Sequence, residues 1–196
     1  MESIVRIILP CMIMMFTACS CEKEKTEDPQ LDEFVAFGDV KSFEPVAIRL
    51  ALLDTNLQPS NTFKEGENFV FSLAIMNLSD STLYLKHHNI NREDLFKVFK
   101  INDDGEEIYI GKPFYYIFCD KVGGNFIKPD EVWELRISWL KDIALDKLIQ
   151  CGEIETYHNE TSPLLHGKYK TKFISKFTFS DYKIDSLSFN FEFEIK

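Results

Sequence analysis

The chain has 196 residues, of which 45 % are hydrophobic and 28 % charged, a composition typical of one globular domain and unlike that of a disordered or fibrous chain. Its formal net charge of −10 disfavours nucleic acid as a partner, because the phosphate backbone binds Lys and Arg and repels an acidic surface. Eighteen Phe residues favour a large core and the pleated surface of β-strands.

The first eighteen residues have the pattern of an export signal. Residues 7–18 carry no charge, and this segment is shorter than the roughly 20 apolar residues that a membrane-spanning helix needs. Its length fits the hydrophobic region of a signal peptide. The residues "FTAC" at 16–19 resemble the lipobox of bacterial lipoproteins, which implies cleavage before Cys19 and acylation of its thiol. The sequence leaves open a plain secretory signal, a buried N-terminal helix, and Cys21 as the acylated residue.

Residues 19–43 are expected to be the lipidated cysteine and a charged tether, followed by one folded domain over 44–196. Between Glu22 and Asp28 acidic residues are interleaved with lysines, so this part cannot bury a core of its own. Acidic residues directly after a lipidated cysteine resemble the surface-export signal of some Gram-negative gut-type anaerobes. The resemblance implies an outer-membrane lipoprotein, held by its N-terminal lipid and either periplasmic or exposed on the cell surface.

Hydrophobic residues after position 43 recur with period two, which places alternate side chains on opposite faces of a β-strand. In residues 187–195 the sequence "LSFNFEFEI" directs five large apolar side chains to one face and four polar side chains to the other. The same pattern predicts further strands at 46–53, 68–77, 82–86, 95–101, 107–111, 132–139 and 169–179. The sequence therefore predicts seven to nine strands.

Turn signals separate these strands, and "NDDG" at 102–105 predicts a hairpin. The segment 140–151 is the exception, because its apolar residues have helical spacing and Asp142 can cap them. We expect a short helix there, inside a crossover loop. Together these elements predict an all-β fold, an immunoglobulin-like sandwich of two antiparallel sheets.

Four segments carry a family resemblance: "FKEGENFVFSLAIMNLSDSTLYL" (63–85), "FKVFKINDDGEEIYIG" (96–111), "IKPDEVWELRISW" (127–139) and "LLHGKYKTKF" (164–173). Their order of turns and strands resembles that of the intracellular proteinase inhibitor family. The resemblance implies an Ig-like fold and raises inhibition of exported or host proteinases as an alternative function. It implies no inhibitory residue, because the family offers no reactive-site motif to match.

No catalytic, metal or cofactor motif is present, so we expect a protein that is not an enzyme and binds no cofactor. Adjacent residues on a strand face opposite ways, so His87 and His88 would not chelate one metal together. A loose Ca²⁺ site from acidic residues 103–107 stays open, beside a solvated hairpin tip as the plainer interpretation. Cys119 and Cys151 either form a disulfide, which export permits, or fill the core as small apolar residues.

An aromatic cluster around a Gly-Gly pair is the candidate ligand patch. It consists of Phe114, Tyr115, Tyr116, Phe118 and Phe126. Exposed rings beside a loop can stack on sugars or contact a protein, whereas core filling is the alternative for most of them. We expect a lipid-anchored binding or assembly module of the cell envelope, whose partner is an envelope protein or a glycan.

Overall fold

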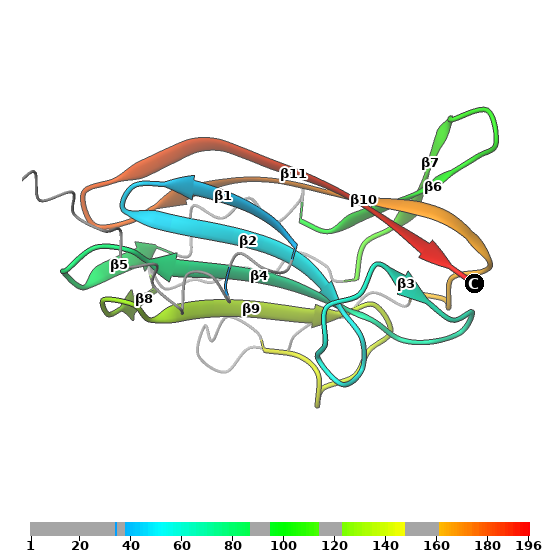
Figure 1. Cartoon of the computed structure of the whole chain (residues 1–196), viewed down its shortest axis with the longest axis horizontal. Helices are drawn as coiled ribbons and strands as arrows, with labels where there is room; N and C mark the ends of the chain where they lie inside the picture. The colour runs from blue at the N-terminus through cyan, green and yellow to red at the C-terminus, as the bar shows by residue number, and fades with distance from the viewer. Residues whose placement is uncertain (1–33, 35–37, 87–94, 114–122, 148–160) are drawn as a thin grey trace, which may run out of the picture.

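The computed structural model describes residues 34, 38–86, 95–113, 123–147 and 161–196, which form two β-sheets packed face to face and a small third sheet (Figure 1). No helix within these ranges is long and apolar enough to cross a membrane. Cys19, Cys119, Cys151 and residues 114–118 lie outside them, so the acylation, the disulfide and four rings of the aromatic patch stay predictions.

The first sheet has the strand order β1-β2-β4-β9, and every neighbouring pair is antiparallel. Its strands are β1 (Asp39–Phe43), β2 (Val46–Leu53), β4 (Val70–Asn77) and β9 (Val132–Ser138). Strand β1 lies inside the range expected to be tether. The sequence did not predict this strand, because its polar residues give no sign that it pairs with β2. The sheet therefore starts at Asp39, five residues before the expected start of the domain.

The second sheet has the order β3-β11-β10-β6-β7. Its strands are β3 (Thr62–Phe63), β6 (Lys97–Ile101), β7 (Glu107–Gly111), β10 (Gly167–Thr178) and β11 (Lys183–Ile195). Strand β3 runs parallel to β11, whereas the other neighbouring pairs of this sheet are antiparallel as expected. The small sheet pairs β5 (Leu83–Lys86) with β8 (Gly124–Ile127).

The connections confirm the immunoglobulin-like sandwich. The chain crosses from β2 in the first sheet to β3 in the second and returns for β4. It then crosses to β6 and β7, returns for β9, and crosses again to β10 and β11. Such crossings between two sheets define this architecture. The described residues hold eleven strands instead of seven to nine, because β1, β3 and β8 are short and lack clear alternation in the sequence.

The core lies between the sheets and is rich in aromatic rings. On β11, Leu187, Phe189, Phe193 and Ile195 are buried as their period-two spacing predicts, and Phe191 is partly buried. Rings from the first sheet meet rings from the second: Phe71 lies 4.9 Å from Phe96, and Phe69 lies 5.3 Å from Phe193, centroid to centroid. Edge-to-face and offset stacked pairs of this kind add to the free energy of area burial.

The outer face of the first sheet is also buried, and small residues line much of it. Ala47, Ala74 and Met76 pack against Phe34 at one end, and a second cluster around Val70 packs against the loops at the other. The Arg49 guanidinium lies 4.7 Å from the centroid of the Phe34 ring and donates a hydrogen bond to the Phe34 carbonyl (3.2 Å). Phe34, five residues before β1, is therefore part of the packed domain.

The helix expected at 140–151 is wrong in its described part, because Leu140–Lys147 forms a turn that returns to the edge of β9. Two aspartates explain the difference. The Asp142 carboxylate accepts the amide of Ala144 (3.0 Å), and the Asp146 carboxylate accepts both the amide (2.7 Å) and the hydroxyl (2.8 Å) of Ser138. Aspartate side chains compete with helical hydrogen bonds in this way.

Candidate functional site

The β6–β7 hairpin stands out from the two layers of the sandwich (Figure 1). Its turn is closed by hydrogen bonds from Asn102 N to Glu106 O and from Gly105 N to Asn102 O, both 2.9 Å. The Asp104 carboxylate accepts the Glu106 amide (3.0 Å), and Gly105 has a φ of +84°, which L-residues rarely adopt. The Asp-Gly pair thus builds the hairpin as predicted, and the hairpin carries three surface features.

Strand β7 is an edge strand with an exposed apolar run. In the described part of the chain it is the last strand of its sheet, and its side chains of Ile108, Tyr109 and Ile110 are 46 %, 52 % and 43 % exposed. A register shift against β6 leaves Ile110 without a partner there, which is a β-bulge. Exposed edge strands offer unpaired backbone groups to another chain, so this run is the strongest contact candidate.

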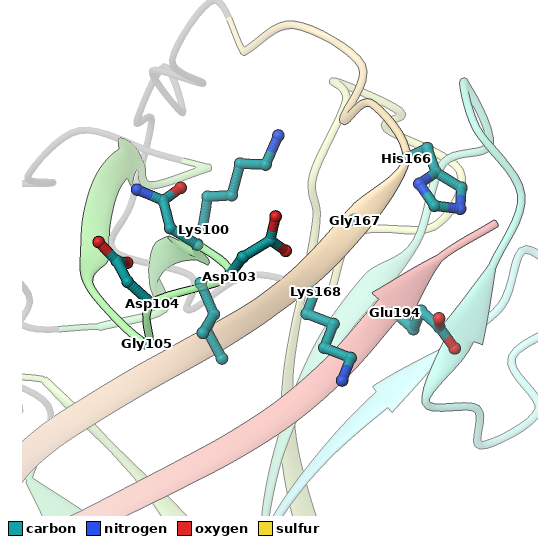
Figure 2. Close-up of a pocket in the computed structure, with 10 residues that line it drawn as sticks. Lys100, Asp103, Asp104, Gly105, His166, Gly167, Lys168 and Glu194 are labelled. Carbon is teal, nitrogen blue, oxygen red and sulfur yellow. The ribbon is translucent and has the colours of Figure 1, made fainter.

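A hollow of about 880 Å³ lies between the hairpin turn and the start of β10 (Figure 2). Its lining contains the charged side chains of Lys100, Lys168, Asp103, Asp104 and Glu194, together with His166. Both signs of charge are present on solvent-facing side chains, which suits a small polar ligand held weakly.

The acidic residues of the turn do not converge on a cation site. Asp104 is used by the turn itself, and Glu107 points to lysines of β10. Within the described ranges no three Asp, Glu, His or Cys side chains gather around a common point. The loose Ca²⁺ site considered for residues 103–107 therefore has no geometric support.

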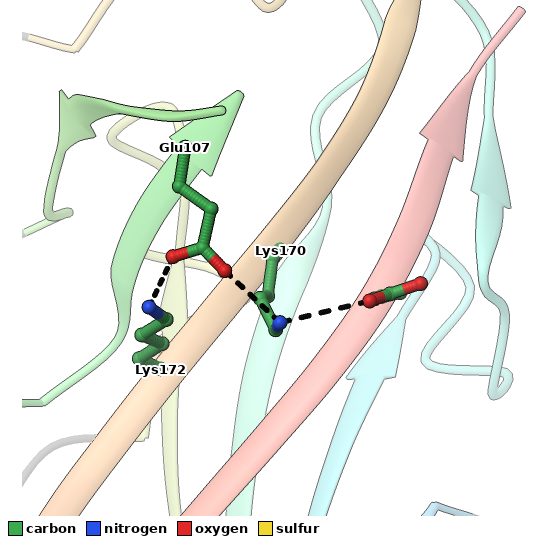
Figure 3. Close-up of polar contacts among 4 residues, drawn as sticks. Glu107, Lys170 and Lys172 are labelled. Atoms are coloured by element: carbon green, nitrogen blue, oxygen red, sulfur yellow. Dashed lines mark hydrogen bonds and ion pairs between the residues drawn. The ribbon is translucent and has the colours of Figure 1, made fainter. Parts of the chain in front are cut away.

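An ion-pair network covers the outer face of the second sheet beside the hairpin (Figure 3). The Glu107 carboxylate contacts the ammonium groups of Lys172 and of Lys170 (3.0 Å), and Lys170 also lies 3.7 Å from Glu192. Hydrogen bonds from the two lysines lower the pKa of Glu107, and the bond from Lys172 has the larger effect. The hydrogen bond to Glu107 in turn raises the pKa of Lys170. These lysines are compensated by carboxylates, so the face is not a basic patch.

Phe126 is the one residue of the expected aromatic patch that the structure describes. It lies on β8 with 71 % of its surface exposed, and its ring centroid is 4.9 Å from that of Tyr84 on β5. A Cβ at position 124 would lie 2.6 Å from Tyr84 Cζ, so a glycine is needed at this position to leave space for the Tyr84 ring. Tyr84 was not predicted, although its place between Leu83 and Leu85 indicates the outer face of a strand.

The exposed run on β7 was also missed. Residues 107–111 were correctly predicted as a strand, but the alternation of one strand cannot show that it ends a sheet. Sheet order depends on pairings between distant segments, here β6 with β10 and with β7. No local signal could therefore have identified Ile108–Ile110 as exposed.

Comparisons with known proteins find only distant structural likeness. No family model and no curated protein matches the chain. Among solved structures it is similar to the ASH / PapD-like domain 7 of human CEP192, with a TM-score of 0.37, 10 % identity, and 78 % of this chain and 85 % of that chain covered. It is similar to ycdA, a candidate lipoprotein of Bacillus subtilis, with a TM-score of 0.29, 11 % identity, and 78 % and 38 % covered. A third structure, the structural-genomics target SoR45, has a TM-score of 0.29, 9 % identity, and 77 % and 88 % covered. Such scores carry no argument about function, and the sandwich described above rests on its strand order.

Proposed function

We propose that this protein is a lipid-anchored binding or assembly module of the cell envelope, without catalytic activity. Acylation of Cys19 would hold it in the outer membrane, and the β6–β7 hairpin would present the contact surface. The observation that carries the proposal is the exposed run Ile108–Ile110 on the edge strand β7. Adjacent exposed apolar side chains on a projecting edge cost solubility, so their presence favours a partner.

The arrangement of titratable groups supports a binding role over a catalytic one. General acid–base chemistry needs groups positioned by partners and protected from water. Lys100, Lys168 and Asp103 line an open hollow, and no ion pair joins them to other described side chains. The strongest charge cluster, around Glu107, has its carboxylate engaged by two lysines and is therefore structural.

Inhibition of exported or host proteinases is the second candidate, and the projecting hairpin is the observation that favours it. It ranks lower because the turn at Asn102–Gly105 is closed by its own hydrogen bonds. A substrate-like inhibitor needs an extended segment that can pair with the enzyme's cleft. Titrating a panel of proteases with the full-length protein separates the two, since the binding proposal expects no inhibition.

Site-specific photo-crosslinking in intact cells tests the main proposal. We expect the full-length protein with p-benzoylphenylalanine in place of Tyr109 to form a covalent adduct in the envelope. The matched control places the same residue at Ile143, which is 79 % exposed on the turn after β9. Adducts at Tyr109 and none at Ile143 support a contact surface on β7. Equal yields at both positions, or no adduct at Tyr109, would refute it.

A further inference from the structure

We propose that Lys41 closes the open edge of β11 and keeps a further strand from pairing on that side of the sandwich. The inference goes beyond the contact surface on β7, because it concerns the other end of the second sheet. Three observations carry it: the length of β11 that has no neighbour, the direction of its backbone groups, and the place of the Lys41 ammonium group.

Most of β11 has a neighbouring strand on one side only. Strand β10 pairs with it between Lys183 and Ile195, whereas β3 pairs with Glu194 and Ile195 alone. Within the described ranges no strand lies beside residues 183–193 on the side away from β10. An edge of this length is a template for another chain, because its backbone groups are unpaired.

The backbone groups of alternate residues of β11 are directed to that open side. The amide of Glu194 donates to the carbonyl of Asn61 (2.9 Å), next to β3. Backbone groups of a strand point alternately to its two sides, so every second residue shares the direction of Glu194. The N–H and C=O groups of Ser188, Asn190 and Glu192 therefore face away from β10.

The ammonium group of Lys41 lies at this edge. Lys41 is paired on β1 with Ile48, a core residue, so its side chain is directed toward the second sheet. Its Nζ atom donates to the Ser188 carbonyl (2.5 Å) and lies 5.2 Å from the centroid of the Phe189 ring. Strand β1 is itself the last described strand of the first sheet, so one lysine connects the open edges of both sheets.

A lysine in this position opposes pairing in two ways. The Ser188 carbonyl already has a donor, so an incoming strand would have to displace the ammonium group from it. The strand would also cover that charge with a backbone ladder that excludes water, and burial of an unpaired charge costs free energy. Inward-pointing charges and exposed lysines are means by which natural edge strands avoid association.

The other edges of the sandwich fit this interpretation. The turn after β9 returns to that strand, where Arg136 and Lys147 exchange two backbone hydrogen bonds (2.9 Å each) and cover part of its edge. By contrast, the run Ile108–Ile110 on β7 carries no charge. Pairing with a further strand is thus disfavoured at β9 and at β11 and stays open at β7.

The test compares the mass of the full-length protein in detergent with that of three variants, by size-exclusion chromatography with light scattering. Lys41→Met removes the charge, keeps an unbranched side chain, and should about double the protein mass by pairing of two copies. Lys41→Arg keeps a charged donor and should leave the mass unchanged. Lys128→Met is the matched control, because it removes one charge from an exposed lysine in the turn between β8 and β9, and it should also leave the mass unchanged.

Amide hydrogen exchange locates the association and separates it from unfolding. In the wild-type protein the amides of Asn190 and Glu192 should exchange faster than those of Phe189 and Phe191, which face β10. In the Lys41→Met protein the amides of Asn190 and Glu192 should exchange at least about tenfold more slowly than in the wild type, while the amides bonded to β10 stay protected.

Each other outcome would overturn the inference. Slow exchange at Asn190 and Glu192 in the wild-type protein would mean that the edge is not open. Equal masses of the wild-type and Lys41→Met proteins would mean that Lys41 does not prevent pairing, and an equal increase in Lys128→Met would assign the effect to net charge. Loss of protection throughout β10 in Lys41→Met would make Lys41 a residue needed for folding and not for the edge.

Discussion

The Nζ atom of Lys170 lies 3.0 Å from Oε1 of Glu107, although β10 and β7 are separated by β6. The ion pair therefore spans a strand and ties the turn end of the β6–β7 hairpin to the centre of the second sheet. Lys172 contacts the other oxygen of the same carboxylate and lies 4.6 Å from the centroid of the Phe99 ring. One carboxylate thus joins β7 to two positions on β10.

Glu107→Gln should lower the melting temperature at neutral pH and have no effect in acid. The pKa of Glu107 is lowered in the folded protein, so its stabilising contribution is complete above the unfolded-state pKa of about 4.3. The contribution disappears as pH falls through the lower folded-state pKa. Thermal unfolding of both proteins from pH 7 to pH 2 measures this. Glu192→Gln is the control with a smaller effect, because its side chain is 69 % exposed and 3.7 Å from Lys170. A difference in melting temperature that is independent of pH would contradict the assignment.

At alkaline pH the stability should depend on Lys170, because the hydrogen bond to Glu107 raises the pKa of this lysine. Its contribution is complete below the unfolded-state pKa of about 10.4 and disappears as pH rises through the higher folded-state value. Lys170→Met should therefore destabilise the protein at neutral pH and lose its effect at strongly alkaline pH. Because the network lies near the surface, salt should weaken both effects.

Asn77→Asp should destabilise the domain by about 3 kcal/mol, because it buries a carboxylate against two carbonyls. The Asn77 carboxamide is fully buried and donates to the carbonyls of Ser81 (2.7 Å) and Ile127 (3.0 Å). Its oxygen accepts the amide (2.9 Å) and hydroxyl (2.7 Å) of Ser79. Urea unfolding measures the loss. Asn61→Asp, at an exposed position, is the matched control, and equal losses would disprove a special role for Asn77.

Trp139→Phe should lower the free energy of unfolding by about 2 kcal/mol, through a cavity and a lost hydrogen bond. Trp139 is 1 % exposed, stacks on Phe69 at 5.9 Å, and donates from its indole nitrogen to the Ser162 carbonyl (2.8 Å). Trp133→Phe should cost less than about 1 kcal/mol, because Trp133 is only partly buried. Denaturant unfolding compares the two, and a larger loss at Trp133 would contradict the packing.

Cys19→Ala should abolish incorporation of radiolabelled palmitate and shift the protein from the membrane to the aqueous fraction. Each buried methylene of an acyl chain contributes about 0.8 kcal/mol to membrane binding. Cys21→Ala is the matched control and should keep both label and location. If the Cys19→Ala protein retained the label, Cys19 would not be the acylated residue, and Cys21 or another attachment would have to carry the lipid. Protease treatment of intact cells then tells surface exposure from a periplasmic position.

Sequence reasoning recovered the parts of the fold that depend on local pattern. The alternation from Leu187 to Ile195 requires a strand with one buried face, and the structure buries that face. "NDDG" requires a tight turn, and the β6–β7 hairpin follows. By contrast, β3 has two residues and exists through its pairing with β11, which is distant in the sequence.

The errors have the same origin in competing or non-local interactions. Asp39, Lys41 and Ser42 make β1 read as tether, yet β1 pairs along its whole length with β2. The helical spacing at 140–147 predicts the wrong structure, because the carboxylates of Asp142 and Asp146 accept backbone amides of Ala144 and Ser138 instead. The residues Ile108–Ile110 are exposed because β7 is the last strand of its sheet in the described part of the chain. The order of strands in a sheet cannot be predicted from any one segment of the sequence. Phe126 could be predicted as part of an aromatic cluster in the sequence. Its contact with Tyr84 could not, because that contact depends on the pairing of β5 with β8.

The position of β11 has a consequence for biogenesis. This strand supplies Phe189, Phe193 and Ile195 to the interior and is bonded on both sides, to β10 and to β3. A nascent chain that has not yet emerged as far as residue 195 lacks the strand on which two neighbours depend, and its interior stays open. Folding of the sandwich therefore waits for residues 183–195, although all strands of the first sheet are already present once β9 has been synthesised.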